Sequence, residues 1–202
     1  MAHTTFFGLP LLTAHGSVMT PRAATEQLVA AALERVGDRP ARVVDVGTGS
    51  GAIAVAIASA APAAEVWATD TSRCAVVLAR ANVCRHGLGG RVTVCQGDLI
   101  DAVPDPIDVV VANLPYLPLA DAGLYPDLAD EPETAVFGPG DGLEPYRRLL
   151  AACSDRLDDD AAVVIQLHRS VLAATGAELP ALRSRLESYA PQPSFVPQLA
   201  AA

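Results

Sequence analysis

The sequence has 202 residues, of which 51% are hydrophobic and 18% are charged, and its formal net charge is −9. That length fits a single domain with a sizeable core, and the acidic balance argues against tight nonspecific binding to nucleic acid, because phosphate neutralisation dominates that affinity. We recognise no signal peptide and no run near the roughly 18 apolar residues of a membrane span, so we expect a cytoplasmic protein without membrane association.

Strand-like and helix-like stretches alternate along the chain, which predicts an α/β fold with a mostly parallel twisted sheet and helices on both faces. Residues 1–22, punctuated by Gly and Pro, are expected to form an extended or hairpin lead-in, and residues 23–202 one domain. Apolar and β-branched runs predict strands at 42–46, 65–69, 91–96, 107–112 and 161–167. Helical spacing predicts helices at 23–35, 52–60, 72–86, 143–156 and 178–189.

Two stretches are less regular. Residues 113–141 are rich in Pro, Gly and Asp, and we expect a long functional loop there. No convincing strand follows residue 167, and the last residues, with Pro191, Pro193 and Pro197, are expected to fray. The C-terminal strand pair of the sheet is therefore predicted to be reduced, and a second copy or a partner subunit is expected to cover the exposed edge.

The four cysteines give no indication of a metal site. They form no Cys-x-x-Cys pair and have no His cluster near them: Cys74, Cys84, Cys95 and Cys153. This usage is typical of free thiols in a reducing compartment, and we expect no bound metal.

A glycine-rich turn, Gly47-Thr48-Gly49-Ser50-Gly51, follows the first predicted sheet strand and opens a helix. Glycines let the backbone approach a ligand closely, and the helix behind them offers unpaired N–H groups. This arrangement is typical of a nucleotide-cofactor turn at the carboxyl edge of a sheet. By itself it fits NAD as well as S-adenosylmethionine.

Acidic residues at or near the ends of three strands bear on the choice between the two cofactors. Asp70, followed by Thr71, ends the second strand, where a carboxylate can bind both ribose hydroxyls of either cofactor. Asp45 can orient the amino group of a methionine moiety, and Asp98-Leu99 can accept from an adenine amino group and cover the ring. NAD needs neither of these last two, so we favour S-adenosylmethionine, with S-adenosylhomocysteine as the product.

The tetrapeptide Asn113-Leu114-Pro115-Tyr116 follows the central apolar strand at the same edge. An amide or aromatic amine nitrogen is a poor nucleophile, and it can be helped by acceptors for both of its N–H bonds. The Asn113 side-chain oxygen and the Leu114 carbonyl can supply them, while Pro115 biases Leu114 toward an extended backbone. Tyr116 can pack on the flat face of the acceptor. These four residues are the predicted catalytic group of an N-methyltransferase.

With these motifs in order, residues 6–150 resemble the HemK/PrmC family, the glutamine N5-methyltransferases of peptide-chain release factors. Further elements carry the resemblance: Phe7-Gly8-Leu9-Pro10, Pro21-Arg22, Thr25-Glu26, Glu131-Pro132 and Asp141-Gly142-Leu143-Glu144-Pro145-Tyr146-Arg147-Arg148. The resemblance implies a Rossmann-like S-adenosylmethionine-dependent methyltransferase fold and, as the acceptor, a protein glutamine, with a peptide-chain release factor as the substrate. It also implies that Gly47 to Gly51, Asp70, Leu99 and Asn113 bind the donor. Pro21, Arg22 and Glu26 would lie near the pocket entrance.

The sequence departs from that family at three places. Leu114 stands where the family usually has a first Pro, the helical N-terminal substrate domain is missing, and Gln166-Leu167-His168-Arg169 replaces an acidic Glu-x-Gly element. Asn-Leu-Pro-Tyr is also the form of ribosomal-RNA adenine dimethyltransferases. Two alternatives therefore stay open: methylation of an exocyclic amine of an RNA or DNA base, with nucleic acid the less favoured partner, and a donor-binding paralogue or partner subunit without turnover.

Overall fold

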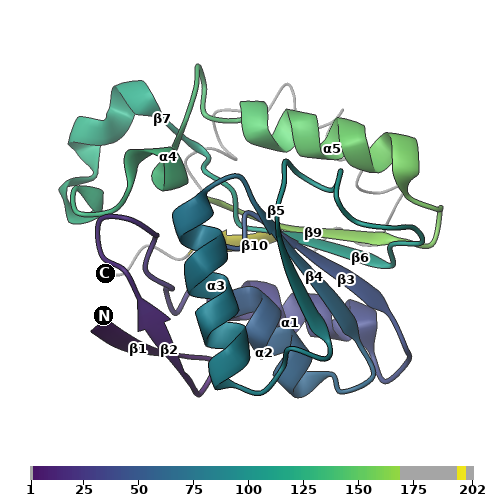
Figure 1. Cartoon of the computed structure of the whole chain (residues 1–202). Helices are drawn as coiled ribbons and strands as arrows, with labels where there is room; N and C mark the ends of the chain where they lie inside the picture. Colours follow the sequence, from purple (N-terminus) through teal and green to yellow (C-terminus); the bar gives the residue numbers. More distant parts are fainter. Residues whose placement is uncertain (1, 169–194, 199–202) are drawn as a thin grey trace.

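The computed structural model describes residues 2–168 and 195–198 of the chain, and these residues build a parallel sheet between helices (Figure 1). The elements in chain order are β1 (Ala2–Phe6), β2 (Leu9–Thr13), α1 (Thr25–Val36), β3 (Arg42–Val46), α2 (Ala52–Ala60), β4 (Glu65–Asp70), α3 (Arg73–Arg85), β5 (Val92–Gln96), β6 (Val109–Ala112), β7 (Leu117–Pro118), the 3-10 turns η1 (Leu119–Leu124) and η2 (Pro126–Leu128), α4 (Glu133–Val136), β8 (Phe137–Gly138), α5 (Glu144–Arg156), β9 (Ala162–His168) and β10 (Phe195–Gln198).

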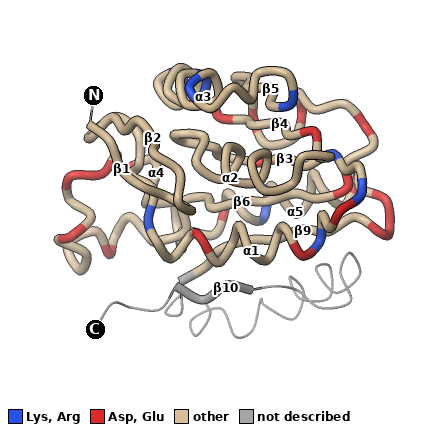
Figure 2. Tube along the Cα trace, turned by 90° about the horizontal axis from the view of Figure 1, so that it is seen from below, with Lys and Arg blue, Asp and Glu red and all other residues tan. Residues whose placement is uncertain are grey.

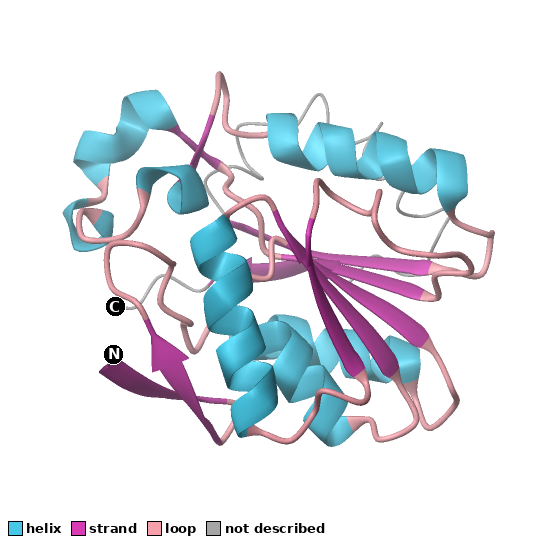
Figure 3. Ribbon diagram, viewed as in Figure 1, coloured by secondary structure: helices cyan, strands magenta, loops and turns pink. Residues whose placement is uncertain are grey.

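The main sheet has the strand order β10-β9-β6-β3-β4-β5, and every neighbouring pair is parallel. Helices α1, α2 and α3 cover one face and α5 covers the other (Figures 1 and 3). Alternating side chains of the strands feed two cores, so that Val43 packs with α1 and α2 while Val44 and Val46 pack with α5. The α/β class, the parallel sheet and the helices on both faces are confirmed.

The helices form for recognisable local reasons. In α1 the buried residues Leu28, Val29, Ala32 and Val36 lie along one stripe, as expected for a helix with one face on a core. Ser72 caps α3, since its hydroxyl accepts a hydrogen bond from the Ala75 N–H at 3.4 Å.

The lead-in is an antiparallel hairpin of β1 and β2, and it packs against the first core through Phe6 and Leu11. Asn82 of α3 ties it to the glycine-rich turn. Its Oδ1 accepts from the Leu12 N–H at 2.8 Å, and its Nδ2 donates to the carbonyls of Leu12 at 3.1 Å and Ser50 at 2.8 Å. One fully buried amide therefore joins hairpin, helix and turn.

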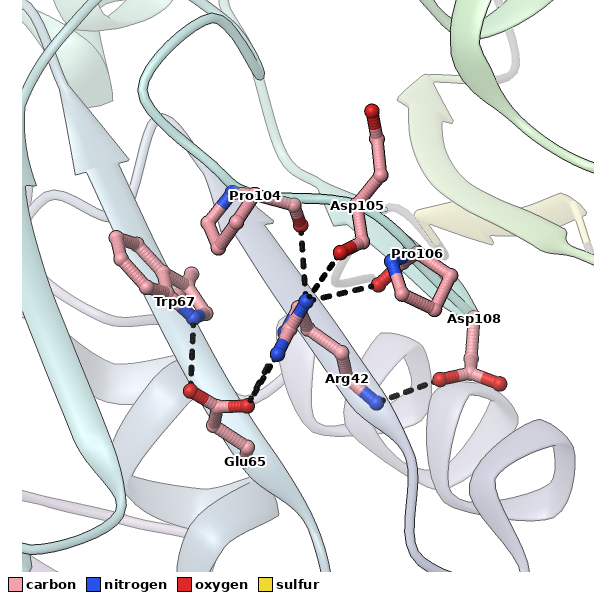
Figure 4. Close-up of polar contacts among 7 residues, drawn as sticks. All are labelled: Arg42, Glu65, Trp67, Pro104, Asp105, Pro106 and Asp108. Atoms are coloured by element: carbon pink, nitrogen blue, oxygen red, sulfur yellow. Dashed lines mark hydrogen bonds and ion pairs between the residues drawn. The ribbon is translucent and has the colours of Figure 1, made fainter.

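Arg42 fastens the amino edge of the sheet (Figure 4). Its guanidinium donates to Glu65 of β4 and to the carbonyls of Pro104, Asp105 and Pro106, which precede β6. Its backbone N–H donates to the Asp108 carboxylate at 2.7 Å. This one side chain joins the starts of β3 and β4 to the connection that leads into β6.

Two expectations about irregular stretches were wrong. Residues 113–141 are not a featureless loop, because they hold short helical turns and the parallel pair β7–β8. The residues around Pro197 do not all fray, since β10 pairs with β9 from Phe195 opposite Ile165 to Gln198 opposite His168. Pro is tolerated there because β10 is an edge strand, where a missing N–H need not break a ladder. The predicted helix at 178–189 lies outside the described residues. Among the described helices, none has the length and apolar character needed to cross a membrane.

Candidate functional site

A pocket of about 310 Å³ opens at the carboxyl edge of the sheet, beside the glycine-rich turn. This is where ligands bind in open parallel α/β sheets. Most of the residues predicted from the sequence line it: Pro21, Arg22, Gly47, Thr48, Gly49, Ser50, Asp70, Thr71, Asp98, Leu99, Asn113, Leu114 and Pro115. Four predicted residues do not: Glu26, Asp45, Gly51 and Tyr116.

The glycine-rich turn has the backbone that its residues require. Gly47, Gly49 and Gly51 have φ of +70°, +56° and +79°, which L side chains rarely adopt. Asp70 holds the turn from β4, because its Oδ2 accepts from the Gly49 N–H at 2.9 Å and its Oδ1 accepts from the Ser72 N–H at 2.8 Å. The carboxylate predicted to meet a ribose is therefore already fixed at the pocket wall.

Asp45 lies beneath the turn and does not line the pocket, so its contact with a methionine amino group stays a prediction. Its Oδ2 accepts from Thr48 Oγ1 at 2.6 Å and from the Ala54 N–H at 3.1 Å, while its Oδ1 is buried without a partner. Burial raises the pKa of Asp45 to about 7. Its visible role is to join the turn to the first residues of α2.

At the third acidic position, Leu99 has a strained backbone and the preceding Asp98 forms an ion pair. Leu99 has a φ of +48° and is held there by a hydrogen bond from Thr69 Oγ1 to its carbonyl at 2.7 Å. A non-glycine residue in this region marks stored backbone strain, which is common at ligand sites. Asp98 pairs with Arg148 of α5, and both line the pocket. Arg148 belongs to the Asp141–Arg148 motif, but its contact with Asp98 was not predicted from the sequence.

Asn113 follows β6 and is oriented by α1. Its Nδ2 donates to Thr25 Oγ1 at 3.4 Å, and both residues line the pocket. Because the amide nitrogen points to Thr25, the oxygen Oδ1 is left to accept from a ligand. In the sequence, Thr25 was recognised only as part of the Thr25-Glu26 element, and its role in orienting Asn113 was not predicted.

The rest of the tetrapeptide is packed from behind. A Cβ at Gly47 would lie 2.6 Å from Leu114 Cδ2, so the Leu114 side chain rests against the first glycine of the turn. Gly142 also packs closely against the tetrapeptide, because a Cβ at Gly142 would clash with the Tyr116 carbonyl oxygen. Tyr116 itself is buried, and burial raises its pKa to about 12. The phenol stays protonated at neutral pH and cannot serve as a general base there.

Charged residues organise the pocket entrance. Arg22 lies 3.8 Å from both Asp127 and Glu131, and Glu131 also accepts from the Thr20 N–H at 3.0 Å. Glu26 accepts from the Phe7 N–H at 2.7 Å, so it fastens the hairpin to α1 away from the pocket wall. The family resemblance implied that Glu26 lies near the pocket entrance, whereas its carboxylate is bonded to the hairpin.

Comparisons with known proteins agree with the fold and the motifs. The family model described as the methyltransferase small domain matches residues 22–122. The release factor glutamine methyltransferases of Gloeobacter violaceus and Deinococcus radiodurans are each 38% identical to this chain, over 88% and 83% of its length. The chain spans 62% and 60% of the length of these relatives.

Among solved structures, the ribosomal protein L11 methylase of Lactobacillus delbrueckii subsp. bulgaricus superposes with a TM-score of 0.55 at 24% identity. The match covers 83% of this chain and 68% of that one. At this level of identity the likeness supports the fold, which is Rossmann-like, as the sequence predicted. The resemblance to release factor glutamine methyltransferases noted from the motifs is also confirmed.

Proposed function

This chain belongs to the methyltransferase small domain family, and we propose that it transfers a methyl group from S-adenosylmethionine to a protein glutamine side chain. The proposed substrate is of the release-factor type, as in the relatives' names. One observation carries the proposal: Asn113, oriented by Thr25, faces the same pocket as the glycine-rich turn and Asp70. Donor site and acceptor clamp thus share one cavity.

The residues present fit the proposed donor. Gly47 and Gly49 leave the pocket floor without side chains, and the preset Asp70 carboxylate stands where ribose hydroxyls would need an acceptor. Leu99, held in a strained backbone, offers an apolar surface for a flat ring. When bound, the donor supplies an electrophilic methyl group on a sulfonium.

The clamp residues give the acceptor nitrogen its direction. Asn113 Oδ1 and the Leu114 carbonyl accept its two N–H bonds and stabilise the positive charge that develops on it. As the nitrogen forms its bond to the methyl carbon, the carbon–sulfur bond breaks and its electron pair stays on sulfur. The methylated nitrogen then loses one proton to water. No carboxylate in the pocket is needed as a base, which agrees with Asp70 and Asp98 being already engaged.

Charge beside the pocket favours a protein acceptor over a nucleic acid. Residues 119–133 carry five acidic residues and no basic one, and Pro132 in this segment lines the pocket. Figure 2 shows the acidic positions along this segment near α4. Such a rim repels phosphates. The two arginines on the pocket wall, Arg22 and Arg148, each pair with a carboxylate.

The remaining parts of the proposal concern place and partners. We propose action in the cytoplasm, which fits free cysteines at Cys74, Cys84, Cys95 and Cys153. A second copy or partner subunit at the C-terminal sheet edge stays a prediction, although β10 already pairs with β9 there.

The test is methyl transfer from labelled S-adenosylmethionine to purified release factors and, in parallel, to ribosomal RNA. We expect label on the release factor. Asn113→Ala should lower kcat at least about 100-fold, the usual cost of losing one oxyanion-type contact. Thr25→Val, which keeps the shape and removes only the orienting hydroxyl, should cause a smaller loss.

Each outcome separates the alternatives. Label on RNA alone would favour the base-amine methyltransferase. Donor binding by calorimetry without any transfer would favour the inactive paralogue. Absence of donor binding, or an Asn113→Ala variant as active as the parent, would refute the proposed site.

A further inference from the structure

The Tyr146 hydroxyl sits at the back of the acceptor clamp. Tyr146 belongs to α5, on the face of the sheet opposite α1, and only 1% of its surface is exposed. Its hydroxyl accepts a hydrogen bond from the Leu114 N–H at 3.0 Å and lies 2.7 Å from the Gln166 carbonyl of β9 and 3.3 Å from the Leu114 carbonyl. One atom therefore meets both polar groups of Leu114 and the neighbouring strand.

A phenol has one proton to donate, so the three contacts cannot be equal. The 2.7 Å contact is the better hydrogen bond, and the proton goes to Gln166 O. The Leu114 N–H occupies a lone pair of the hydroxyl. The Leu114 carbonyl, at 3.3 Å, is held near the hydroxyl while its lone pairs stay available to a ligand.

We propose that Tyr146 is the positioning residue of the acceptor clamp: its buried hydroxyl contacts both the N–H and the carbonyl of Leu114, so it fixes the Leu114 backbone on both sides of Cα and aims the carbonyl. The proposal rests on the proposed function and adds a residue that never touches the acceptor. Burial raises the pKa of Tyr146 well above its usual range, so the hydroxyl keeps its proton at any working pH.

The identity of residue 114 makes this bond necessary. A proline there would fix φ through its ring and would carry no N–H. Leucine loses that restraint and brings a buried donor, which must be satisfied or costs free energy. Tyr146 satisfies the donor, and the Leu114 side chain against Gly47 completes the anchoring. The tetrapeptide is thus held by a hydrogen bond where a ring would otherwise hold it.

The test is a double-mutant cycle between residues 114 and 146. Tyr146→Phe leaves the Leu114 N–H without a partner and should lower kcat for methyl transfer to a release factor about tenfold or more, because clamp geometry is lost. S-adenosylmethionine affinity should change less than about twofold, since Tyr146 does not line the pocket. In Leu114→Pro/Tyr146→Phe the orphan donor is gone, and kcat should recover to within about threefold of the parent.

Cys153→Ala is the matched control. Cys153 is a fully buried residue of the same helix and is not a hydrogen-bond partner of Leu114 as Tyr146 is. It should lower Tm at least as much as Tyr146→Phe and leave kcat unchanged. Equal losses of kcat in both variants, or no recovery in the double variant, would reduce Tyr146 to a structural residue and overturn the proposal.

A second readout does not depend on turnover. Hydrogen exchange of the Leu114 amide should be slow in the parent and at least about tenfold faster in Tyr146→Phe, while the Val110 amide inside β6 should stay protected. If the parent transfers no methyl group, the proposed function fails while this measurement still tests the bond. Unchanged exchange at Leu114 refutes the bond itself.

Discussion

The two edges of the central sheet are built in opposite ways. At the amino edge, Arg42 pairs its guanidinium with Glu65 and three carbonyls. At the carboxyl edge, buried polar atoms stay unpaired. Within residues 2–168 the buried side-chain atoms without a partner are Thr20 Oγ1, Arg22 Nε, Asp45 Oδ1 and Gln166 Oε1; Thr20 and Arg22 line the pocket, and Asp45 lies beneath the glycine-rich turn. Side-chain hydrogen bonds therefore hold the amino edge together, whereas the carboxyl edge keeps unpaired polar atoms. Buried polar atoms without a partner are rare in folded proteins and mark functional sites.

The largest effect at the carboxyl edge of the sheet is expected from Gly142→Ala. Gly142 has a φ of +86°, and the new Cβ would meet backbone atoms of Tyr116 and Leu117 that cannot move aside alone. We expect kcat to fall at least about 100-fold and stability to fall about 3 kcal/mol, measured by methyl transfer and by urea unfolding.

Gly140→Ala is the control for that variant. Gly140 also has a positive φ, of +61°, but nothing lies within 4 Å of its Cβ position. It should cost about 1 kcal/mol from backbone strain, with kcat kept. Similar activities for the two variants would show that contact with Tyr116 does not matter.

The second prediction concerns how the ionisation of Asp45 changes the free energy of unfolding with pH. Burial raises its pKa from 3.8 to about 7. Between these values the unfolded carboxyl ionises while the folded one keeps its proton, so the folded state binds more protons and stability falls as pH rises. Above about pH 7 the cost is fully present, at most about 4 kcal/mol.

Asp45→Asn should remove this slope, because the amide does not titrate. Urea unfolding at pH 5 and pH 8 should show the parent losing a few kcal/mol more than the variant. Parallel losses in the two proteins would mean that Asp45 does not titrate in this window. The lowered pKa values of Asp108 and Asp141 act at lower pH and do not interfere.

The smallest expected effect lies at the fastened edge. Arg42→Ala removes charged hydrogen bonds from a side chain that is only 22% exposed, and should cost about 2 kcal/mol of stability. Methyl-transfer kcat should stay within about twofold, since Arg42 lies at the opposite edge from the pocket. Arg39→Ala removes a single ion pair with Asp108 that is more exposed to solvent, and it should cost under about 1 kcal/mol of stability. A loss of kcat in Arg42→Ala without a loss of stability would contradict the division between the edges.

The central sheet could be predicted because its strands are buried on both faces and read as continuous apolar runs, such as Val109–Ala112. The glycine-rich turn could be predicted because its residues have no other common use before a helix. The pairing of β7 with β8 could not, since it depends on Gly142 packing closely against the backbone of Tyr116 and Leu117, which are distant in the sequence. For β10, the prolines suggested fraying, while the open edge of β9 decides the pairing.

The direction in which Asp45 points could have been predicted from the alternation of side chains along the strand. Val44 and Val46 both pack toward α5, so the residue between them must face α2, beneath the turn. Its position two residues before Gly47 suggested that its side chain faces the pocket. The alternation of side chains along β3 instead decides which way it points. Tyr146 was out of reach of such reasoning, because its contact with Leu114 joins residues 32 positions apart.

The buried Asn82 amide has a consequence for how the molecule orders. It satisfies both polar groups of Leu12 and the Ser50 carbonyl at once, and losing either side strands a buried donor or acceptor. The β1–β2 hairpin and the glycine-rich turn are therefore joined through one side chain, and a chain cut at residue 14 would leave Asn82 Oδ1 without its partner beside that turn.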